Sequence, residues 1–267
     1  NQIRMTSSLS LQWHERTIDI EYTWVGVTTA EAADAPIMVF LHEGLGSVAM
    51  WKDFPDTLCR QLNMRGLVYS RPGYGASTPR AVDEHWEVDF LHRQATDILP
   101  ALLQALHISR PWFFGHSDGG SIALLFAACF PEALAGAIVV APHIFVEDIS
   151  IESIRLAREA YLHQGLREKL ARYHKDVDSA FFGWNDVWLS PAFRTWDITS
   201  ELSGIRCPLF AIQGKQDEYG TMRQVQGIRL LCRQTEVLEL DECGHSPHRD
   251  QPARLISSVK DFVLRAH

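Results

Sequence analysis

Residues 112–130, WFFGHSDGGSIALLFAACF, decide how the rest of the chain is interpreted. The segment starts as an apolar run, passes through a turn framed by Gly115 and Gly119, and continues as an almost wholly apolar helical pattern. Glycine is needed at these framing positions because a sharp turn strains its central residue and leaves no room for side chains beside it. The G-x-S-x-G spacing between a buried strand and a helix is typical of a nucleophile elbow. It predicts a reactive side chain at the carboxyl end of a strand and the N-terminus of a helix.

Ser117 and Asp118 are adjacent candidates for the nucleophile of this turn. The flanking glycines place Ser117 at the top of the turn, so we assign attack to its hydroxyl rather than to the neighbouring carboxylate. The backbone N–H of Asp118 is then expected to stabilise an oxyanion, and its side chain to complement the helix dipole. In the alternative interpretation, this carboxylate contacts substrate or a covering segment and disfavours acidic groups nearby.

The rest of the chain alternates between strand-like runs and helical patterns. Residues 16–26 alternate apolar and polar side chains, which predicts a half-buried strand in an antiparallel start of a sheet. Residues 88–106 have helical spacing, with Pro100 as an expected kink. We therefore predict the α/β class, a mostly parallel central sheet with helices on both faces. The further predicted strands, apolar runs closed by turn residues, cover residues 37–41, 66–75, 111–117, 135–142, 207–214 and 235–245.

One segment interrupts the alternation. Residues 144–204 contain no good candidate for a buried strand, and strongly helical patterns there are followed by an aromatic-rich stretch. We predict a helical cap at residues 144–204, inserted into a core formed by residues 1–143 and 205–267. Two ordinary crossover helices without a lid role are the alternative interpretation.

Composition bounds the cellular context and the partners. The 267 residues are 46% hydrophobic and 22% charged, with a formal net charge of −8 and no basic block, so nucleic acid is not an expected partner. No run approaches the ~18 apolar residues of a membrane span, and the first residues lack the apolar core of a signal peptide. Five scattered cysteines without a C-x-x-C pair favour buried free thiols in a reducing compartment. We expect a cytoplasmic protein without a membrane partner, and Met5 is a candidate natural start.

Several segments together resemble the α/β-hydrolase superfamily, and the resemblance covers nearly the whole chain. FLHEGLGS at residues 40–47 is similar to the family's oxyanion loop, and SRPGYGAST at residues 70–78 to the loop after the following strand. GHSDGG at residues 115–120 is similar to the elbow. IQGKQDEYG at residues 212–220 and DECGHSPHRDQP at residues 241–252 look like the loops that carry an acid and a histidine.

Chemistry and chain order point to three catalytic candidates. A serine hydroxyl is a poor nucleophile at neutral pH and needs a base, and that base needs a carboxylate to fix its tautomer. In this fold the order is serine, acid, histidine, and Ser117, Asp217 and His245 satisfy it. Glu218 and Asp148 are alternative acids, the latter because some relatives carry the acid after the preceding strand.

The expected oxyanion loop departs from the family pattern. The resemblance assigns the second backbone donor to Gly44, beside the N–H of Asp118. Glu43 stands where relatives usually have glycine, which puts the geometry of the loop in question unless its side chain holds the loop by a hydrogen bond. Arg71, in the next loop, is expected to be structural. His248 is expected at the surface, and no metal site or other cofactor is predicted.

The substrate pocket is predicted from aromatic residues under the cap. Their density also fits packing between cap and core, so the two interpretations remain open. If several face the site, the substrate is apolar or aromatic. The pocket candidates are Glu43, Trp51, His143, Trp184 and Trp188, with Phe145, Phe181, Phe182 and Trp196 as further aromatic candidates.

These patterns predict a serine hydrolase that cleaves a small-molecule carboxylic ester through an acyl-enzyme. A thioester, amide, lactone or activated C–C bond could be cleaved with the same residues. A cofactor-free oxygenase or perhydrolase and a slow-turnover small-molecule receptor are alternatives from other classes, because one fold supports many chemistries. The oligomeric state is left open.

Overall fold

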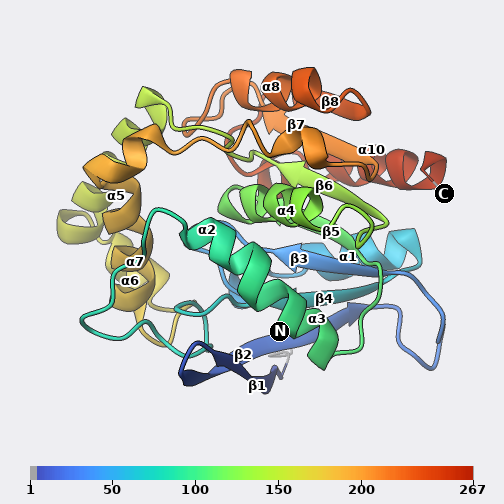
Figure 1. Ribbon diagram of the computed structural model, residues 1–267, viewed down its shortest axis with the longest axis horizontal. Helices are drawn as coiled ribbons and strands as arrows, with labels where there is room; N and C mark the ends of the chain where they lie inside the picture. The colour runs from blue at the N-terminus through green and yellow to red at the C-terminus, as the bar shows by residue number, and fades with distance from the viewer. Residues whose placement is uncertain (1–4, 267) are drawn as a thin grey trace.

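The computed structural model describes residues 5–266, so the segment preceding Met5 lies outside the described residues. It contains an eight-stranded sheet in the order β1-β2-β4-β3-β5-β6-β7-β8 (Figure 1). β1 and β2 pair antiparallel, β2 pairs antiparallel with β4, and all later pairs are parallel, which confirms the predicted α/β class. The strands are β1 (Ser7–Trp13), β2 (Arg16–Gly26), β3 (Ile37–Leu41), β4 (Arg65–Tyr69), β5 (Trp112–His116), β6 (Gly136–Val140), β7 (Leu209–Gly214) and β8 (Thr235–Leu240).

The first strand was not predicted from the sequence. β1 lies at the edge of the sheet and pairs only with β2, and its serines face solvent while Leu11 and Trp13 are buried. Leu9, Leu11 and Trp13 alternate with polar residues, which is the signal of a half-buried edge strand, but the alternation is shorter than the one in residues 16–26.

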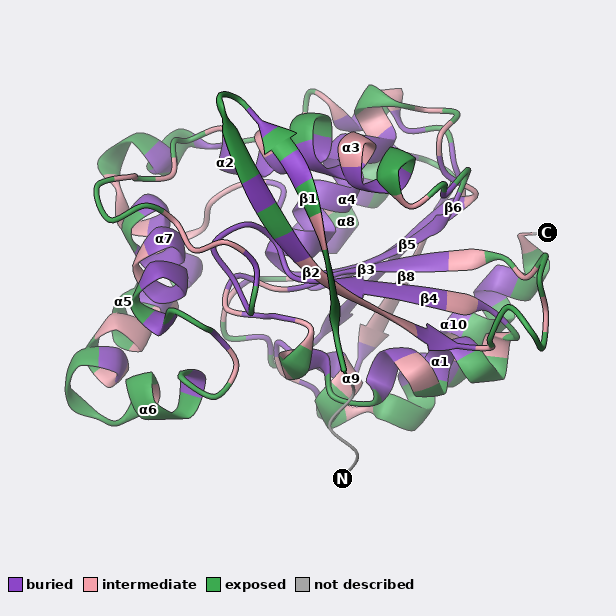
Figure 2. Cartoon of the chain, turned by 90° about the horizontal axis from the view of Figure 1, so that it is seen from below, coloured by how far each residue is buried: buried purple, intermediate pink, exposed green. Residues whose placement is uncertain are grey.

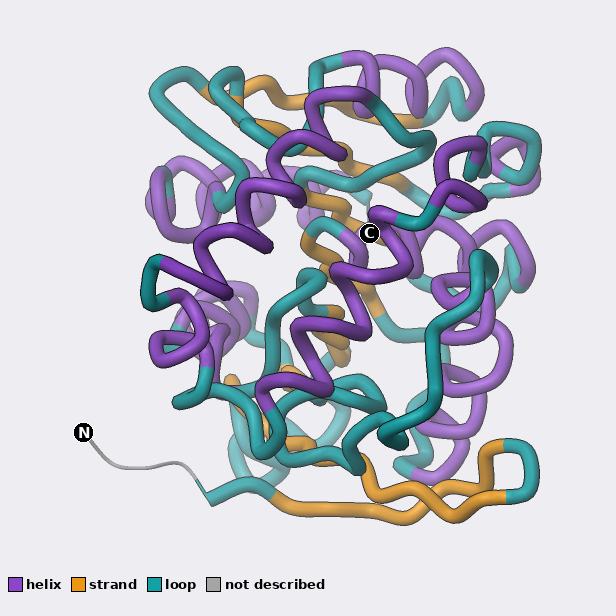
Figure 3. Tube along the Cα trace, turned by 90° about the vertical axis from the view of Figure 1, so that its left-hand side faces the viewer, coloured by secondary structure: helices purple, strands orange, loops and turns teal. Residues whose placement is uncertain are grey.

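Helices cover both faces of the sheet. Figure 3 shows the strands between two sets of helices, and each set packs its own apolar cluster against the sheet. One face carries α1 (Phe54–Leu62) and α10 (Pro252–Arg265). The opposite face carries α2 (Phe90–Arg93), α3 (Leu99–Ala105), α4 (Asp118–Cys129) and α8 (Arg223–Leu231). Two short elements, η1 (Ala49–Trp51) and α9 (Pro247–Asp250), lie in the loops after β3 and β8.

The expected kink near Pro100 takes the form of a π-turn. Residues Gln94–Ile98 form a π-helical turn (η2) between α2 and α3, and Pro100 lies in the first turn of α3. Proline has no N–H and its ring displaces the carbonyl four residues earlier, so a wider turn before it avoids the clash.

The segment between β6 and β7 leaves the sheet and returns to nearly the same place. It contains α5 (Asp148–His163), α6 (Leu166–Leu170), α7 (Val177–Leu189) and two short 3-10 turns, η3 (Pro191–Thr195) and η4 (Leu202–Gly204). Phe145 and Asp197 form an isolated antiparallel bridge where the segment begins and ends. α7 faces inward and is mostly buried, whereas α6 and the outer side of α5 are exposed (Figure 2). The division of the chain into a core and a cap remains a prediction.

The cysteines are free thiols, and four of the five are buried as expected. Cys129 is the exception, because it ends α4 at the surface although its neighbours are apolar. No helix among residues 5–266 is long and apolar enough to cross a membrane.

Candidate active site

Ser117 occupies a strained turn between β5 and α4. Its φ of 54° and ψ of −118° lie outside the regions that side chains favour, and its backbone N–H donates to Val140 O at 2.8 Å. A Cβ on Gly115 would approach Gly119 O to 2.3 Å, and a Cβ on Gly119 would approach Leu41 O to 2.1 Å. These two glycines therefore let the turn close against neighbouring backbone, which raises the Ser117 hydroxyl at the carboxyl end of β5.

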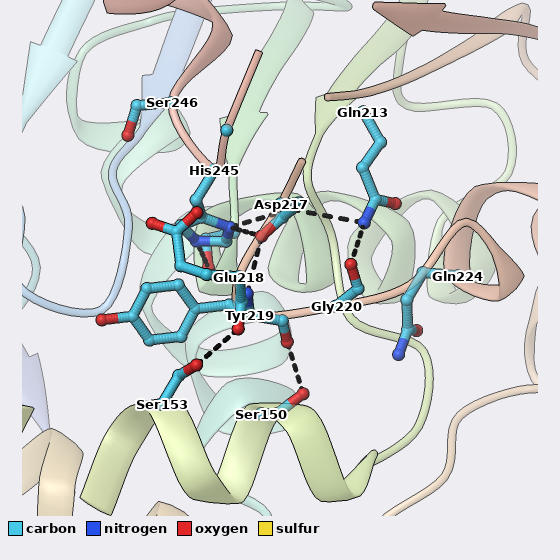
Figure 4. Close-up of polar contacts among 12 residues, drawn as sticks. Ser150, Ser153, Gln213, Asp217, Glu218, Tyr219, Gly220, Gln224, His245 and Ser246 are labelled. Carbon is cyan, nitrogen blue, oxygen red and sulfur yellow. Dashed lines mark hydrogen bonds and ion pairs between the residues drawn. The ribbon is translucent and has the colours of Figure 1, made fainter. Parts of the chain in front are cut away.

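Ser117, His245 and Asp217 form a continuous hydrogen-bonded series. His245 Nε2 lies 3.0 Å from Ser117 Oγ, and His245 Nδ1 lies 2.9 and 3.0 Å from the two carboxylate oxygens of Asp217. Asp217 also accepts from the backbone N–H of Tyr219 at 2.8 Å and from Gln213 Nε2 at 3.3 Å. Figure 4 shows the Asp217 carboxylate between His245 and Gln213. The loops after β7 and β8 thus bring an acid and an imidazole to the serine.

The charges of this series stabilise each other. Burial disfavours the cationic form of His245, but the hydrogen bond and charge of Asp217 outweigh it and raise the pKa of His245 above its ordinary value. Burial likewise disfavours ionised Asp217, yet its bonds with His245 and Tyr219 keep its pKa below the ordinary value. Asp217 is therefore ionised at neutral pH and holds a proton on the Nδ1 side of His245.

Neither alternative acid approaches the imidazole in this way. Asp148 is exposed at the start of α5 and pairs with Arg194. The Glu218 backbone carbonyl accepts from Ser153, and the Tyr219 carbonyl accepts from Ser150, so α5 anchors the loop that carries Asp217 (Figure 4).

The loop after β3 faces the elbow without backbone strain at Glu43. Glu43 does not have a positive φ, and its carboxylate accepts from Leu45 N at 3.3 Å, so a side-chain hydrogen bond does hold the loop. Arg71 donates from its guanidinium to the carbonyl oxygens of His42 and Glu43. A Cβ on Gly44 would lie 2.3 Å from Trp184 Nε1 and 3.1 Å from an Asp118 carboxylate oxygen, so only glycine fits there.

The Asp118 side chain reaches the inserted segment. It begins α4, as expected, but its carboxylate is only 1% exposed and accepts from Trp188 Nε1 on α7 at 3.2 and 3.3 Å. Burial raises the pKa of Asp118 to about 6, although Arg71 opposes the shift. This contact agrees with one part of the alternative interpretation, because the carboxylate touches the segment that is predicted to cover the site.

A cavity of about 270 Å³ opens beside Ser117. Four of the predicted pocket residues line it, namely Glu43, His143, Trp184 and Trp188. The sequence did not single out Tyr219 or Arg249, which also line it, although both lie in the two loops that resemble the family's acid and histidine loops. The cavity's apolar wall on the inserted segment, which was also missed, comes from Ile154, Ala157, Leu166 and Leu170.

Trp51 is not among the cavity-lining residues, contrary to prediction. Its ring packs on the other side of the sheet, 5.6 Å from the ring of Phe40 and 5.9 Å from that of Phe114. At η1 the loop after β3 passes to the face of the sheet that α1 and α10 cover. The sequence does not indicate which face of the sheet an aromatic residue will cover. The other aromatic candidates, Phe145, Phe181, Phe182 and Trp196, also do not line the cavity and pack against the core on the α4 side.

His248 is another correction. It does not lie free at the surface, because its ring packs 5.2 Å from the ring of Trp51 and 5.0 Å from that of His116. Burial lowers the pKa of His248 to about 2, so its ring is neutral. Among residues 5–266 there is no group of three or more His, Cys, Asp or Glu side chains placed to hold a metal ion.

The fold and the site together define an α/β enzyme with its reactive side chains at the carboxyl ends of the strands. Residues 38–258 match the family described as "Alpha/beta hydrolase family", and the chain belongs to this family. It is an enzyme of the hydrolase class.

Individual relatives are distant. The chain is 25% identical over 253 residues to the protein named "Putative carbamate hydrolase RutD" of Pseudomonas savastanoi, covering 86% of this chain and 95% of that one. It is 26% identical over 263 residues to 2-succinyl-6-hydroxy-2,4-cyclohexadiene-1-carboxylate synthase of Klebsiella pneumoniae, covering 85% and 94%. A thermophilic esterase from Thermogutta terrifontis superposes with a TM-score of 0.74 at 18% identity, over 98% of this chain and 99% of that one, which shows the shared fold.

Proposed function

We propose that this chain is a serine hydrolase that cleaves a small-molecule carboxylic ester through an acyl-enzyme. The observation that carries the proposal is the series Ser117 Oγ–His245 Nε2 at 3.0 Å and His245 Nδ1–Asp217 at 2.9 Å. Hydrogen-bond distances of this size allow proton transfer in the step where the serine attacks.

The first half of the reaction forms the acyl-enzyme. His245 Nε2 takes the hydroxyl proton as Ser117 Oγ attacks the ester carbonyl, and the imidazolium then protonates the departing alkoxide. The backbone N–H groups of Asp118 and Gly44 stabilise the oxyanion, and the N-terminus of α4 adds its dipole. In the second half, His245 activates a water that releases the acid and restores Ser117.

Asp217 acts through His245. It keeps the proton on Nδ1, leaves Nε2 free to accept, and stabilises the imidazolium that forms during attack. Its own position is held by Tyr219 N and Gln213.

We also propose residues 144–204 as a cap over the site and the cytoplasm as the place of action. The apolar wall supplied by α5 and α6 supports the cap, and the free thiols support a reducing compartment. Glu43, His143, Trp184 and Trp188 would contact an apolar or aromatic substrate.

An ester is preferred because it is the least demanding substrate for these groups. The proteins to which this chain is similar include esterases and a putative carbamate hydrolase, and the cleavage of an ester or a carbamate begins with attack on a carbonyl carbon. A carbamate or an amide needs stronger protonation of its leaving group than an ester does.

Labelling with a fluorophosphonate tests the nucleophile. Intact mass spectrometry is expected to show one adduct on the wild type and on the control Ser200→Ala, whose serine is exposed, and none on Ser117→Ala. An unlabelled wild type would contradict the acyl-enzyme mechanism.

A substrate panel tests the bond. A burst of p-nitrophenol from p-nitrophenyl acetate is expected for the wild type and not for His245→Ala. Matched acyl esters, thioesters, amides, carbamates and vinylogous 1,5-diketones then rank the bond types by kcat/KM. The proposal fails if a bond other than the ester leads this ranking.

A further inference from the structure

The catalytic cavity carries more negative than positive charge. Three acidic residues are among the described residues that line it, Glu43, Asp118 and Glu218, against one arginine, Arg249. Arg249 donates to Ser246 Oγ at 2.9 Å, and Glu218 is exposed at the rim. A cluster of this kind raises the local concentration of cations and repels anions.

These carboxylates are not neutralised by ion pairs within residues 5–266. Glu43 accepts one backbone N–H, from Leu45, and Asp118 accepts the indole N–H of Trp188. Arg71 lowers the pKa of Asp118, but its guanidinium is directed to the carbonyls of the loop after β3 and does not line the cavity. The negative charge is therefore available to a ligand.

The aromatic side chains around the carboxylates suit a cation as well. Trp184, Trp188 and Tyr219 line the same cavity, and the ring of Tyr219 lies 4.6 Å from that of His245. Aromatic faces attract ammonium groups, and indole does so most strongly.

A separate observation comes from His143, a buried polar side chain that lacks a partner. It lines the cavity, is 3% exposed, and its Nδ1 has no hydrogen-bond partner among the described residues. Its ring lies 4.9 Å from the ring of Trp188 and 6.1 Å from that of His245. Burial lowers the pKa of His143 to about 3, so this ring is neutral and adds no positive charge to the cavity that it lines.

We propose that the cavity selects substrates that carry an aliphatic ammonium group on an otherwise apolar body. The ammonium would lie between the carboxylates and the indole rings, while the apolar body contacts the wall from α5 and α6. For the reaction, the proposal rests on the proposed function; for binding, it rests on the cavity alone.

Binding to Ser117→Ala tests the selectivity without any hydrolysis. Calorimetry would compare hexylammonium, hexanol and hexanoate, which differ mainly in the charge of the head group. We expect hexylammonium to bind at least about tenfold more tightly than hexanol, and hexanoate to bind most weakly. The advantage is expected to shrink as sodium chloride rises from 0.05 to 0.5 M, because salt screens charges near the rim.

Glu218→Gln and Glu132→Gln, each in the Ser117→Ala background, give a matched pair. Glu218→Gln is expected to weaken hexylammonium several-fold without weakening hexanol, and Glu132→Gln, exposed after α4, to change neither. The proposal is overturned if hexanol or hexanoate binds as tightly as hexylammonium, or if hexylammonium does not bind. Loss of ester hydrolysis in the wild type with the ammonium preference intact would instead contradict only the proposed reaction.

Discussion

Two regions of this molecule each bury an aspartate near the cavity that Ser117 lines, and the surroundings of the two carboxylates differ. In the loops after β7 and β8, Asp217 accepts from an imidazole, a backbone N–H and an amide, and its pKa is lowered. Where the elbow meets α7, Asp118 accepts from one side-chain donor among residues 5–266, the indole N–H of Trp188, and burial raises its pKa to about 6. The two carboxylates differ in the number of hydrogen-bond donors that reach them, and their pKa values are shifted in opposite directions.

This contrast shows how one residue type supplies two kinds of electrostatics within one site. Asp217 is held ionised by donors that fix the imidazole, which suits a group that must stay charged through a reaction. The pKa of Asp118 lies close to neutral pH, so a charged group that binds in the cavity can change the protonation state of this carboxyl.

The largest effect is expected when the charge is removed from the well-supported aspartate. Asp217→Asn keeps the shape but lets the amide donate to Nδ1, which favours the wrong tautomer of His245. We expect kcat for a p-nitrophenyl ester to fall about 10⁴-fold, or about 5.5 kcal/mol in activation free energy. A loss below tenfold would mean that Asp217 does not orient the base.

For Asp118→Asn we expect a smaller change, and it is a gain rather than a loss: the free energy of unfolding should increase relative to the wild type. A carboxyl whose folded pKa is about 6 and whose unfolded pKa is about 3.9 destabilises the folded state progressively as the pH rises between these values. From pH 4 to pH 8 the variant should therefore gain up to about 3 kcal/mol relative to the wild type in the free energy of unfolding.

Urea unfolding at several pH values measures this gain. Asp217→Asn is the counterpart, because a lowered carboxyl pKa stabilises the folded protein above the unfolded pKa, so this variant should lose stability relative to the wild type as the pH rises. Parallel pH curves for Asp118→Asn and the wild type would refute the buried-charge interpretation.

Removing the indole donor to Asp118 tests the contrast between the two aspartates further. Trp188→Phe leaves the carboxylate without its indole partner, and we expect a loss of about 2 kcal/mol in the free energy of unfolding. Trp196→Phe is the matched control, since the Trp196 Nε1 is buried without a hydrogen-bond partner and its N–H contributes no bond. Equal losses for the two variants, measured by denaturant titration, would show that ring packing alone accounts for both.

The smallest effect is expected from removing one of several donors to Asp217. Gln213→Leu deletes the amide that lies 3.3 Å from the carboxylate while His245 and Tyr219 N remain. A loss of about 1 kcal/mol in activation free energy, roughly fivefold in kcat, is the expected result. Gln226→Leu, which removes a surface bond to Glu239, is the control and should leave kcat unchanged.

The sequence predicts the parts of this molecule that depend on neighbours along the chain. The segments that form β2–β8 are apolar or alternating because each strand is buried on one or both faces. The turn at Ser117 could be predicted because local backbone contacts require glycine at positions 115 and 119. The edge strand β1 was not predicted from the sequence, because it buries only part of one face.

Contacts between distant segments could not be predicted in this way. Trp188 follows Asp118 by 70 residues and looks like any other aromatic residue of an inward-facing helix. Trp51 and Trp184 are equally aromatic, yet the path of the chain after β3 sends Trp51 beneath the sheet while α7 brings Trp184 to the cavity. The apolar character of these side chains predicts that they will be buried. Which residues they pack against depends on the path of the chain in the folded structure.

The bridge between Phe145 and Asp197 has a practical consequence for engineering. The segment between β6 and β7 begins and ends at neighbouring positions, because Ile198 N donates to Ile144 O at 2.9 Å beside this bridge. The two ends of the segment are therefore held together by backbone hydrogen bonds. A graft of a different helical excursion at these two positions would leave the pairing of β6 with β7 unchanged. Because α5 anchors the loop that carries Asp217 and Trp188 donates to Asp118, a graft would have to reproduce these contacts to keep the reactive groups in place.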